Sequence, residues 1–567
     1  MVNDPVCLME KDTGARVIYD ADPQQLMARL APNGYPVILA GGDQMNEAQR
    51  GVEHLLEART DGLVLPDWVA HGVEFMAASF VFIVGSVTLI VVVMFIIDIT
   101  QRRNAIRRNY PVLGRFRYLF GRLGEFFRQY FFAMDREEMP FNRAEREWVE
   151  RAAGGADNTI AFGSTKNMNV EGTPIFMGCP FPTLKRDTVG TQPMEIGPHC
   201  RHPYLAPSIF NISGMSFGAL SAPAVRALSR GAKMAGCWLN TGEGGLSPYH
   251  LEGGCDLVFQ IGSAKYGVCN PDGSLNEEKL RDIAARPEVK LFEIKLSQGA
   301  KPGRGGILPA AKISREVAEI RGIRMDEDSI SPNRHPEIGT VQQLLDFVDR
   351  VRQVTGKPVG IKTMVGSDDW LDELCREIGR RGVESAPDFI TVDGGEGGSG
   401  AAPMALMDNV GLPLREALPR VADMLVRHGL KQRVRLIASG KLVAPANVAW
   451  ALCAGADFVN AARGFMFALG CIQALKCNKN SCPTGVTTHN VRLQAGLDPQ
   501  VKSVRVANYC QNIVHEVEMI AHACGVPKPR ALGRHHVRIV GSDGLSRPMD
   551  ELYSIRNYVK GKNNDGV

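Results

Sequence analysis

Three apolar runs near the middle of the chain decide the fold: FITVDGG (389–395), RLIASG (435–440) and FVNAARG (458–464). Each run is rich in apolar or β-branched residues and ends in a glycine. A helix-like stretch at 413–428 separates the first run from the second. Strands that alternate with helices pair in parallel through βαβ crossovers. The runs therefore predict an α/β fold built on a parallel sheet.

The same unit repeats upstream, with helix-like stretches at 222–235, 341–355 and 369–381. Five further runs have the same character: SIFNIS (208–213), CWLNT (237–241), LVFQI (257–261), LFEIKL (291–296) and VGIKTM (359–364). Eight such units predict a closed (β/α)8 TIM barrel, and a doubly wound open sheet is the alternative. In such barrels the active site lies at the carboxyl ends of the strands, where polar residues and glycines gather in this sequence.

A long apolar segment precedes the predicted barrel. Phe75 to Ile97 reads FMAASFVFIVGSVTLIVVVMFII and has no charged residue. At about 1.5 Å per residue it covers a hydrocarbon core of roughly 30 Å. We expect a transmembrane helix, and a buried core helix is the alternative.

The flanks of this segment are asymmetric. Residues 1–74 are mainly acidic, whereas arginines follow the segment: Arg102, Arg103, Arg107, Arg108, Arg115, Arg117, Arg122 and Arg128. The positive-inside rule predicts a single-pass protein of the cell (inner) membrane with its catalytic domain in the cytoplasm. The basic, aromatic stretch 117–132 would lie in the headgroup region or pack on the soluble domain.

These features predict five parts. Residues 1–70 form a small arm with a helix near 44–58, and its opening DPVCLM is similar to YHS domains, without any chemistry assigned. The others are a membrane helix (75–97), a basic helical linker (99–175), the barrel with its cysteine loop (176–500), and a C-terminal helix and tail (501–567). The formal net charge of +4 does not suggest a nucleic-acid partner.

Cys471, Cys477 and Cys482 stand apart from the other ten cysteines because they lie within a dozen residues, among loop-forming residues. Three thiolates suit an iron–sulfur cluster with three irons. Zinc would want a fourth ligand, for which His489 is the candidate, and a chance grouping or a disulfide is the remaining alternative.

Five separated motifs resemble the FMN-binding, iron–sulfur synthase domain of glutamate synthases. They are GMSFGALS (214–221), NTGEGG (240–245), EIKLSQGAKPGRGGILP (293–309), DGGEGGSGAAP (393–403) and GCIQALKCNKNSCPTGVTT (470–488). The resemblance covers roughly residues 175–500. The apolar segment and RRNYPVLGRFRYL (107–119) look like the shorter, membrane-associated branch of that family.

The resemblance implies FMN at the top of the barrel and a [3Fe-4S] cluster on Cys471, Cys477 and Cys482. It also implies an oxidoreductase acting on CH-NH2 donors, which transfers hydride to the imine of a 2-oxo acid such as 2-oxoglutarate and ammonia. Lys362 would face the flavin ring, with the turn Gly214, Met215 and Ser216 against it. Backbone N–H groups would hold the phosphate at Gly394, Gly395, Ser439, Gly440, Arg463 and Gly464.

Four residues are candidates for binding and converting the substrate. Lys295, Gln298 and Lys301 offer donors for a dicarboxylate, and Glu243 could handle protons or ammonium. A solvated loop and, for the glycines, plain turns are the alternatives.

The sequence departs from full-length glutamate synthases in several ways. Met1 is followed by Val2 rather than cysteine, and we find no G-x-G-x-x-G in a βαβ context. We therefore expect that the nitrogen comes from outside the chain and that an external donor such as ferredoxin or a reductase supplies the electrons. A homo-oligomer is compatible with the sequence. Two other functions stay open: an N-methylglutamate synthase-like transferase that joins an amine to glutamate, and a non-catalytic membrane electron-transfer subunit.

Overall fold

The computed structural model describes residues 6–10, 14–18, 37–38, 67–101, 105–127, 131 and 134–553. The chain divides into two compact units, Met1–Phe132 and Ala133–Val567. The two units are described separately below. The helix expected near 44–58 lies outside the described residues.

The described residues of the first unit form a small antiparallel sheet and three helices. Strands β1 (Val6–Glu10), β2 (Gly14–Ile18) and β3 (Val37–Ile38) pair in the order β2-β1-β3. Helix α3 (Asp67–Thr100) contains the whole apolar segment predicted to cross a membrane. Helices α4 (Ala105–Asn109) and α5 (Leu113–Phe127) follow it.

Helix α3 is the one described helix that is long and apolar enough to span a membrane. Its candidate span runs over 30 residues, His71–Thr100, and no part of its most apolar window is buried. At about 1.5 Å per residue this exceeds the roughly 30 Å hydrocarbon core. Within the described residues nothing covers its apolar side chains, so the alternative of a buried core helix is not supported.

The second unit is a closed barrel of eight parallel strands, as the eight sequence runs predict. Each run forms one strand: β7 (Phe210–Ile212), β8 (Leu239–Asn240), β9 (Leu257–Ile261), β10 (Val289–Lys295), β13 (Val359–Met364), β14 (Phe389–Asp393), β15 (Arg435–Ser439) and β16 (Phe458–Ala461). The strands follow one another around the barrel in chain order, and β16 pairs with β7 to close it. The doubly wound open sheet is therefore excluded.

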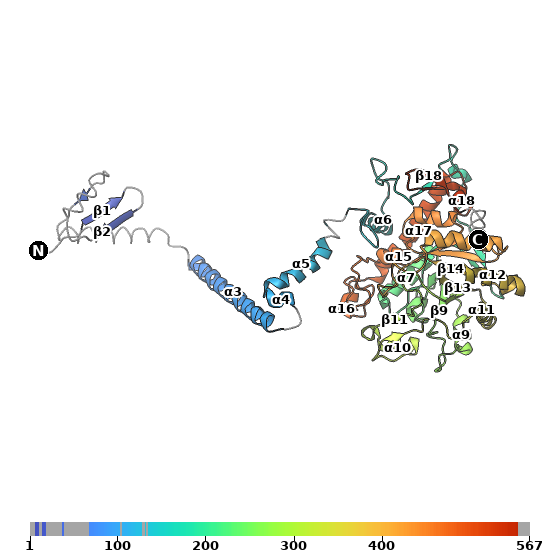
Figure 1. The fold of residues 1–567 in the computed structure, drawn as a ribbon, viewed down its shortest axis with the longest axis horizontal. Helices are drawn as coiled ribbons and strands as arrows, with labels where there is room; N and C mark the ends of the chain where they lie inside the picture. Colours follow the sequence, from blue (N-terminus) through green and yellow to red (C-terminus); the bar gives the residue numbers. More distant parts are fainter. Residues whose placement is uncertain are drawn as a thin grey trace, which may run out of the picture. The chain divides into compact units, whose positions relative to one another are not determined.

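Helices surround the strands in Figure 1. They are α7 (Ala222–Ala235), α8 (Pro248–Leu251), α9 (Glu277–Ala284), α11 (Val341–Thr355), α12 (Asp369–Arg381), α13 (Leu414–Arg427), α14 (Pro445–Cys453) and α15 (Arg463–Ala468). Their ends follow local sequence signals. In α7, for example, the Ser221 hydroxyl accepts a hydrogen bond from the N–H of Ala224, and Gly236 ends the helix at φ +69°.

The long connection between β10 and β13 forms its own substructure. It contains the hairpin β11 (Ile307–Leu308) and β12 (Ser329–Ile330) and the helix α10 (Arg315–Arg321). The 3-10 helix η4 (Ala310–Lys312) also lies in this connection. The other described 3-10 helices lie in other loops of the unit: η3 (Lys185–Asp187), η5 (Val383–Ser385), η6 (Pro529–Ala531) and η7 (Arg534–His536).

Residues before and after the barrel pack on its outside. Helix α17 (Pro499–Ala523) packs on α7 and on α6 (Arg143–Ala153), and α16 (Val491–Gln494) precedes it. Strand β17 (Val537–Val540) joins β4 (Pro174–Phe176) and β18 (Ser546–Pro548) in a sheet, and α18 (Met549–Leu552) follows. The two flanks are therefore part of the same compact unit as the barrel.

Apolar side chains close the amino end of the barrel. The hairpin β5 (Met194–Ile196) and β6 (Tyr204–Ala206) packs there against Trp238, Phe389 and Phe458, all of which are buried. Because this end is filled, the polar strand ends at the opposite mouth form the accessible part of the barrel.

Candidate functional site

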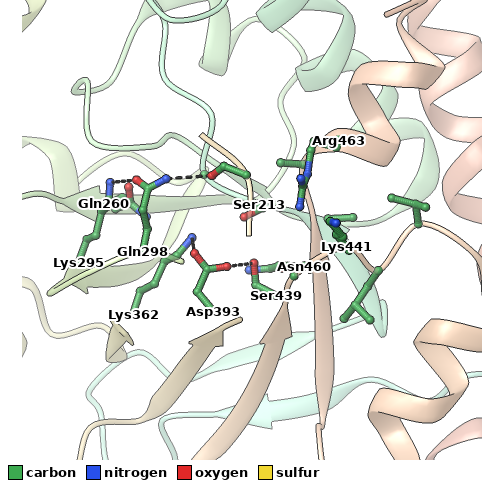
Figure 2. A pocket seen from close by; sticks show the side chains of 17 residues that line it. Ser213, Gln260, Lys295, Gln298, Lys362, Asp393, Ser439, Lys441, Asn460 and Arg463 are labelled. Carbon is green, nitrogen blue, oxygen red and sulfur yellow. Dashed lines mark hydrogen bonds and ion pairs between the residues drawn. The ribbon is translucent and has the colours of Figure 1, made fainter. Parts of the chain in front are cut away.

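A polar pocket opens at the carboxyl ends of the strands (Figure 2). It contains about 530 Å³ of atom-free space, open solvent included. Lysine and arginine supply four of the side chains around it and aspartate supplies one, so the pocket favours an anion. Its lining residues are Ser213, Gly214, Gln260, Lys295, Gln298, Lys362, Asp393, Gly398, Ser439, Gly440, Lys441, Leu442, Val443, Asn460, Ala461, Ala462 and Arg463.

On one side of the pocket, Lys295 joins two of the predicted catalytic residues. Its Nζ donates to Oε1 of Gln298 at 2.7 Å and lies 3.0 Å from Oε1 of Glu243. The amide of Gln298 donates in turn to the carbonyl of Gly398 at 2.9 Å. A Cβ at Gly306 would lie 2.4 Å from Oε1 of Glu243, so glycine is needed for the loop to close over this carboxylate.

Burial and charge set the protonation of this group. Burial alone would raise the pKa of Glu243, but the ammonium groups of Lys295 and Lys301 outweigh it, and the pKa falls below its ordinary value. For Lys301, burial first and the nearby Lys295 second lower the pKa to about 8. The site therefore combines an ionised carboxylate with a lysine that can release a proton near neutral pH.

Lys362 occupies the floor of the pocket. Its Nζ lies 3.5 Å from Oδ2 of Asp393, and Oδ1 of Asp393 accepts from the Ser439 hydroxyl at 2.8 Å. Burial would lower the pKa of Lys362, but Asp393 and Glu293 raise it overall, so the ammonium stays charged. Figure 2 shows this group between Lys295 on one side and Arg463 on the other.

Below this floor, the barrel interior contains a fully bonded carboxylate. Glu293 accepts hydrogen bonds from the amides of Asn240 at 2.8 Å and Gln260 at 2.7 Å, and from the Thr391 hydroxyl at 2.6 Å. A buried carboxylate with three donors is fixed in place and keeps its neighbours fixed.

The opposite side of the pocket is cationic and glycine-rich. Arg463 donates to the carbonyl of Glu396 at 2.9 Å, and its guanidinium lies 4.7 Å from the ring centre of Phe141. Lys441 lies beside it, and burial lowers the pKa of both side chains. Gly440 has φ +144°, a backbone conformation that L side chains rarely adopt. This side suits a phosphate group best.

Two of the predicted phosphate-binding positions use their N–H groups within the protein, and a third is a close-packed glycine. The N–H of Gly394 donates to the carbonyl of Ser439, and that of Gly395 donates to Leu412, both at 2.8 Å. At Gly464 a Cβ would lie 2.0 Å from the hydroxyl of Tyr509, so this glycine serves close packing. This corrects the expectation that all six positions offer free N–H groups.

The turn predicted to lie against a flavin ring is held from behind. Nη2 of Arg321 donates to the Ser216 hydroxyl at 3.1 Å and to the carbonyl of Phe217 at 3.0 Å. The N–H of Met215 donates to the carbonyl of Asn240 at 3.3 Å. Arg321 is 4 % exposed and its Nε has no partner within the described residues, so a buried guanidinium lies against this turn.

The three predicted metal-ligating cysteines lie in one loop that follows α15. Their thiols are close enough for charge on Cys477 and Cys482 to raise the pKa of Cys471, after burial, to about 11. Cys482 differs: burial would raise its pKa, but hydrogen bonds from Thr484 and Thr487 outweigh burial and lower the pKa to about 7. The ammonium of buried Lys312 donates to the carbonyl of Cys477 at 3.2 Å.

The described residues contain no group of three His, Cys, Asp or Glu side chains arranged to hold a single metal ion. His489 is also occupied, because its Nε2 lies 2.9 Å from the carbonyl of Gly218. The zinc alternative is therefore not supported. An iron–sulfur cluster with several irons would not need the three thiols to meet at one ion, because each thiolate would bind a different iron.

Three polar residues of the pocket escaped the sequence interpretation: Gln260, Lys441 and Asn460. Strand register brings three pocket side chains together, because Asp393, Ser439 and Asn460 are paired on the neighbouring strands β14, β15 and β16. Four of the residues predicted to act in catalysis or to face the flavin do not line the pocket. Glu243 and Lys301 lie near Lys295, which does line it, and the other two are Met215 and Ser216.

Comparison with known proteins gives one consistent family. Residues 188–527 match the family model described as the conserved region in glutamate synthase. The glutamate synthase large subunit-like protein YerD of Bacillus subtilis is 38% identical over 517 residues, which are 84% of this chain and 98% of that protein. The archaeal glutamate synthase [NADPH] of Methanocaldococcus jannaschii is 33% identical over 347 residues, 61% of this chain and 64% of that protein.

The chain thus spans nearly all of the Bacillus relative but less than two thirds of the archaeal one. Among solved structures, a putative lactate oxidase of Pediococcus acidilactici gives a TM-score of 0.41 at 15% identity, covering 70% of this chain and 93% of that one. A likeness of that size says nothing about the reaction.

Proposed function

The chain belongs to the glutamate synthase family, and we propose that it is an FMN- and iron–sulfur-dependent oxidoreductase that converts a 2-oxo acid, such as 2-oxoglutarate, to its amino acid. The observation that carries this proposal is the group formed by Glu243, Lys295 and Gln298 beside a cationic pocket. An electron-transfer subunit without catalysis would have no need for such a group, whose members come from separate parts of the chain.

In the net reaction the 2-oxo acid loses its carbonyl oxygen as water, gains the nitrogen of ammonia and accepts two electrons and two protons. Lys295 and Lys301 would bind carboxylate oxygens of the substrate, and Gln298 would fix their direction. Glu243, ionised and enclosed by Gly306, would hold ammonium or pass a proton to the reacting carbon–nitrogen bond.

The pocket residues fit FMN. Arg463, Lys441 and the Gly440 turn would bind its phosphate, and the Lys362 ammonium would stabilise negative charge on the reduced ring. Bound there, FMN would supply two-electron transfer to the substrate. Asp393 and Ser439 keep Lys362 in position through their own hydrogen bonds.

The cysteine loop fits an iron–sulfur cluster held by Cys471, Cys477 and Cys482. Three non-glycine residues of this loop, Gln473, Leu475 and Asn480, have positive φ, a strained backbone that the surrounding structure has to maintain. A [3Fe-4S] cluster would relay electrons one at a time between the pocket and an external donor. A ferredoxin, a reductase or a membrane carrier would serve as that donor.

Helix α3 supports an anchored location for this enzyme. With the arginine-rich stretch after Thr100 on the cytoplasmic side, the catalytic unit would work in the cytoplasm at the inner face of the cell membrane. Neither the proposed membrane span nor the small-molecule site indicates a nucleic-acid partner.

The test is anaerobic purification of the full chain, a visible spectrum and two assays. We expect flavin absorbance with a broad iron–sulfur shoulder, and amino-acid formation from 2-oxoglutarate, ammonium and a reduced dye. Turnover of glutamate with methylamine, without electrons, would favour the N-methylglutamate synthase-like transferase instead. Cofactors without turnover of any of these substrates would favour the electron-transfer subunit.

A further inference from the structure

The last turn of α3 contains a buried carboxylate. Asp98 is fully buried, the one such residue among the described side chains of this helix. Its Oδ1 accepts from Nε of Arg107 and from Nη2 of Arg115, both at 2.8 Å, and its Oδ2 accepts from Nε of Arg115 at 2.7 Å and from the N–H of Val112 at 3.1 Å. A two-point arginine–carboxylate contact of this kind fixes direction as well as distance. The first turn of α5 is therefore fixed to the end of α3.

Helix α5 has an apolar stripe that no other described residue of its unit buries. Four of its large apolar residues recur at intervals of three and four and are exposed: Leu113, Phe116, Phe120 and Leu123. The rings of Phe116 and Phe120 stack with their centres 6.1 Å apart, so the stripe is continuous. Contiguous apolar surface of this kind marks an interaction site.

Two observations identify a lipid surface as the occupant. The first is continuity, because Asp98 places the start of the stripe where the exposed apolar surface of α3 ends. The second is charge: between residues 98 and 127 the sequence has seven arginines and two acidic residues. Exposed Tyr110 adds an aromatic side chain of the type that gathers at membrane interfaces.

We propose that α5 lies flat in the boundary between headgroups and acyl chains of an anionic membrane, with its apolar stripe in the lipid and its arginines on lipid phosphates. The proposal rests on the proposed function only in taking α3 as a membrane span. Asp98 acts as the positioning residue that turns the chain from the span into the interface. An interfacial helix at this point adds a second, lateral attachment to the single span.

A photoreactive diazirine amino acid tests the location in the full chain, reconstituted in vesicles of phosphatidylethanolamine and phosphatidylglycerol. It is placed singly at Phe120 in the stripe, at Arg117 outside the stripe, and at Ile90 in the span. All three side chains are exposed, so folding should tolerate the change. We expect lipid adducts at Phe120 and Ile90 and few at Arg117, as measured by mass spectrometry.

Adducts from Phe120 to barrel peptides or to a second copy of the chain would overturn the proposal, as would equal lipid labelling at Phe120 and Arg117. In either case lipid adducts at Ile90 would leave the span intact. If Ile90 also gave no lipid adducts, the membrane location in the proposed function would fail together with the interfacial helix.

Two substitutions test charge and positioning. Arg117→Gln should lower the preference of Phe120 labelling for anionic over phosphatidylcholine vesicles about fivefold, the effect of one arginine near a charged surface. Asp98→Asn should reduce lipid labelling at Phe120 and leave labelling at Ile90 unchanged. Asp135→Asn, at an exposed carboxylate, is the matched control. Unchanged labelling in both test variants would overturn the assigned roles.

Discussion

The carboxylate of Glu243 lies 3.0 Å from the ammonium of Lys295, although Glu243 follows β8 and Lys295 ends β10. Glycine at position 306 lets the loop after β10 close over the same carboxylate. The pair is partly buried, so charge on either residue acts strongly on a bound substrate.

Glu243→Gln keeps the size of this side chain and removes its charge. We expect kcat for reductive amination to fall about 10²- to 10⁴-fold, the usual loss when a general acid–base group is removed. FMN content should stay unchanged, because Glu243 does not line the pocket. Glu316→Gln, whose carboxylate accepts from the Tyr249 hydroxyl, is the control. A kcat equal to that of the control would contradict the assigned role.

Lys301 should impose a pH dependence on substrate capture. Its pKa is lowered to about 8, so the free enzyme has an ammonium below that pH and a neutral amine above it. We expect kcat/KM for the 2-oxo acid to fall as pH rises through about 8. In Lys301→Arg the guanidinium stays charged and this falling limb should vanish. Persistence of the limb in the variant would assign it to another group.

Arg463→Gln tests the phosphate side of the pocket. Losing a charge-assisted contact to phosphate costs about 1.5–3 kcal/mol, so the FMN dissociation constant should rise about 10- to 100-fold. Titration of flavin-free protein, followed by flavin fluorescence, measures this constant. Arg226→Gln, at an arginine bound to Glu252 away from the pocket, should leave it unchanged. Equal constants in the two variants would place the phosphate elsewhere.

Cys477→Ser tests the cysteine loop. A serine hydroxyl is a poor ligand for iron, so we expect loss of the iron–sulfur shoulder and of protein-bound iron, with flavin retained. Cys269→Ser, at a free cysteine outside this loop, is the matched control. Full iron content in Cys477→Ser would exclude this thiol as a ligand.

Gln473→Leu tests a buried amide that joins the cysteine loop to residues before the barrel. The Gln473 side chain accepts from the N–H of Phe141 at 3.2 Å and donates to the Phe141 carbonyl and the Glu138 carboxylate, both at 3.0 Å. Leaving these groups without partners should cost about 2–4 kcal/mol of unfolding free energy, measured by denaturant titration. Gln511→Leu, at an exposed amide, should change it little. A similar loss in both would show that the amide has no special role.

The strand pattern predicted the barrel well because each run combines an apolar body with a polar end. Glu243, Lys295 and Gln298 could be recognised as a set because each follows a strand or lies in a neighbouring loop. Gln260 and Asn460 escaped because they lie inside apolar runs, where local sequence shows only a strand. Their role follows from register, which brings Asn460 beside Ser439.

Contacts across long sequence distances were beyond the reach of pattern analysis. The stacking of Arg463 on Phe141 and the bonds of Gln473 join residues that no local period relates. The same holds for Gly464, whose glycine is explained by Tyr509 on α17 rather than by a ligand.

The bond between Phe141 and Gln473 also has a consequence for biogenesis. The two residues are 332 positions apart, so the ribosome makes Gln473 long after α3 has left the exit tunnel. The loop that contains the three cysteines can form this contact only after the 332 residues that follow Phe141 have been made. The cluster proposed for that loop would therefore be inserted only after α3 has been synthesised.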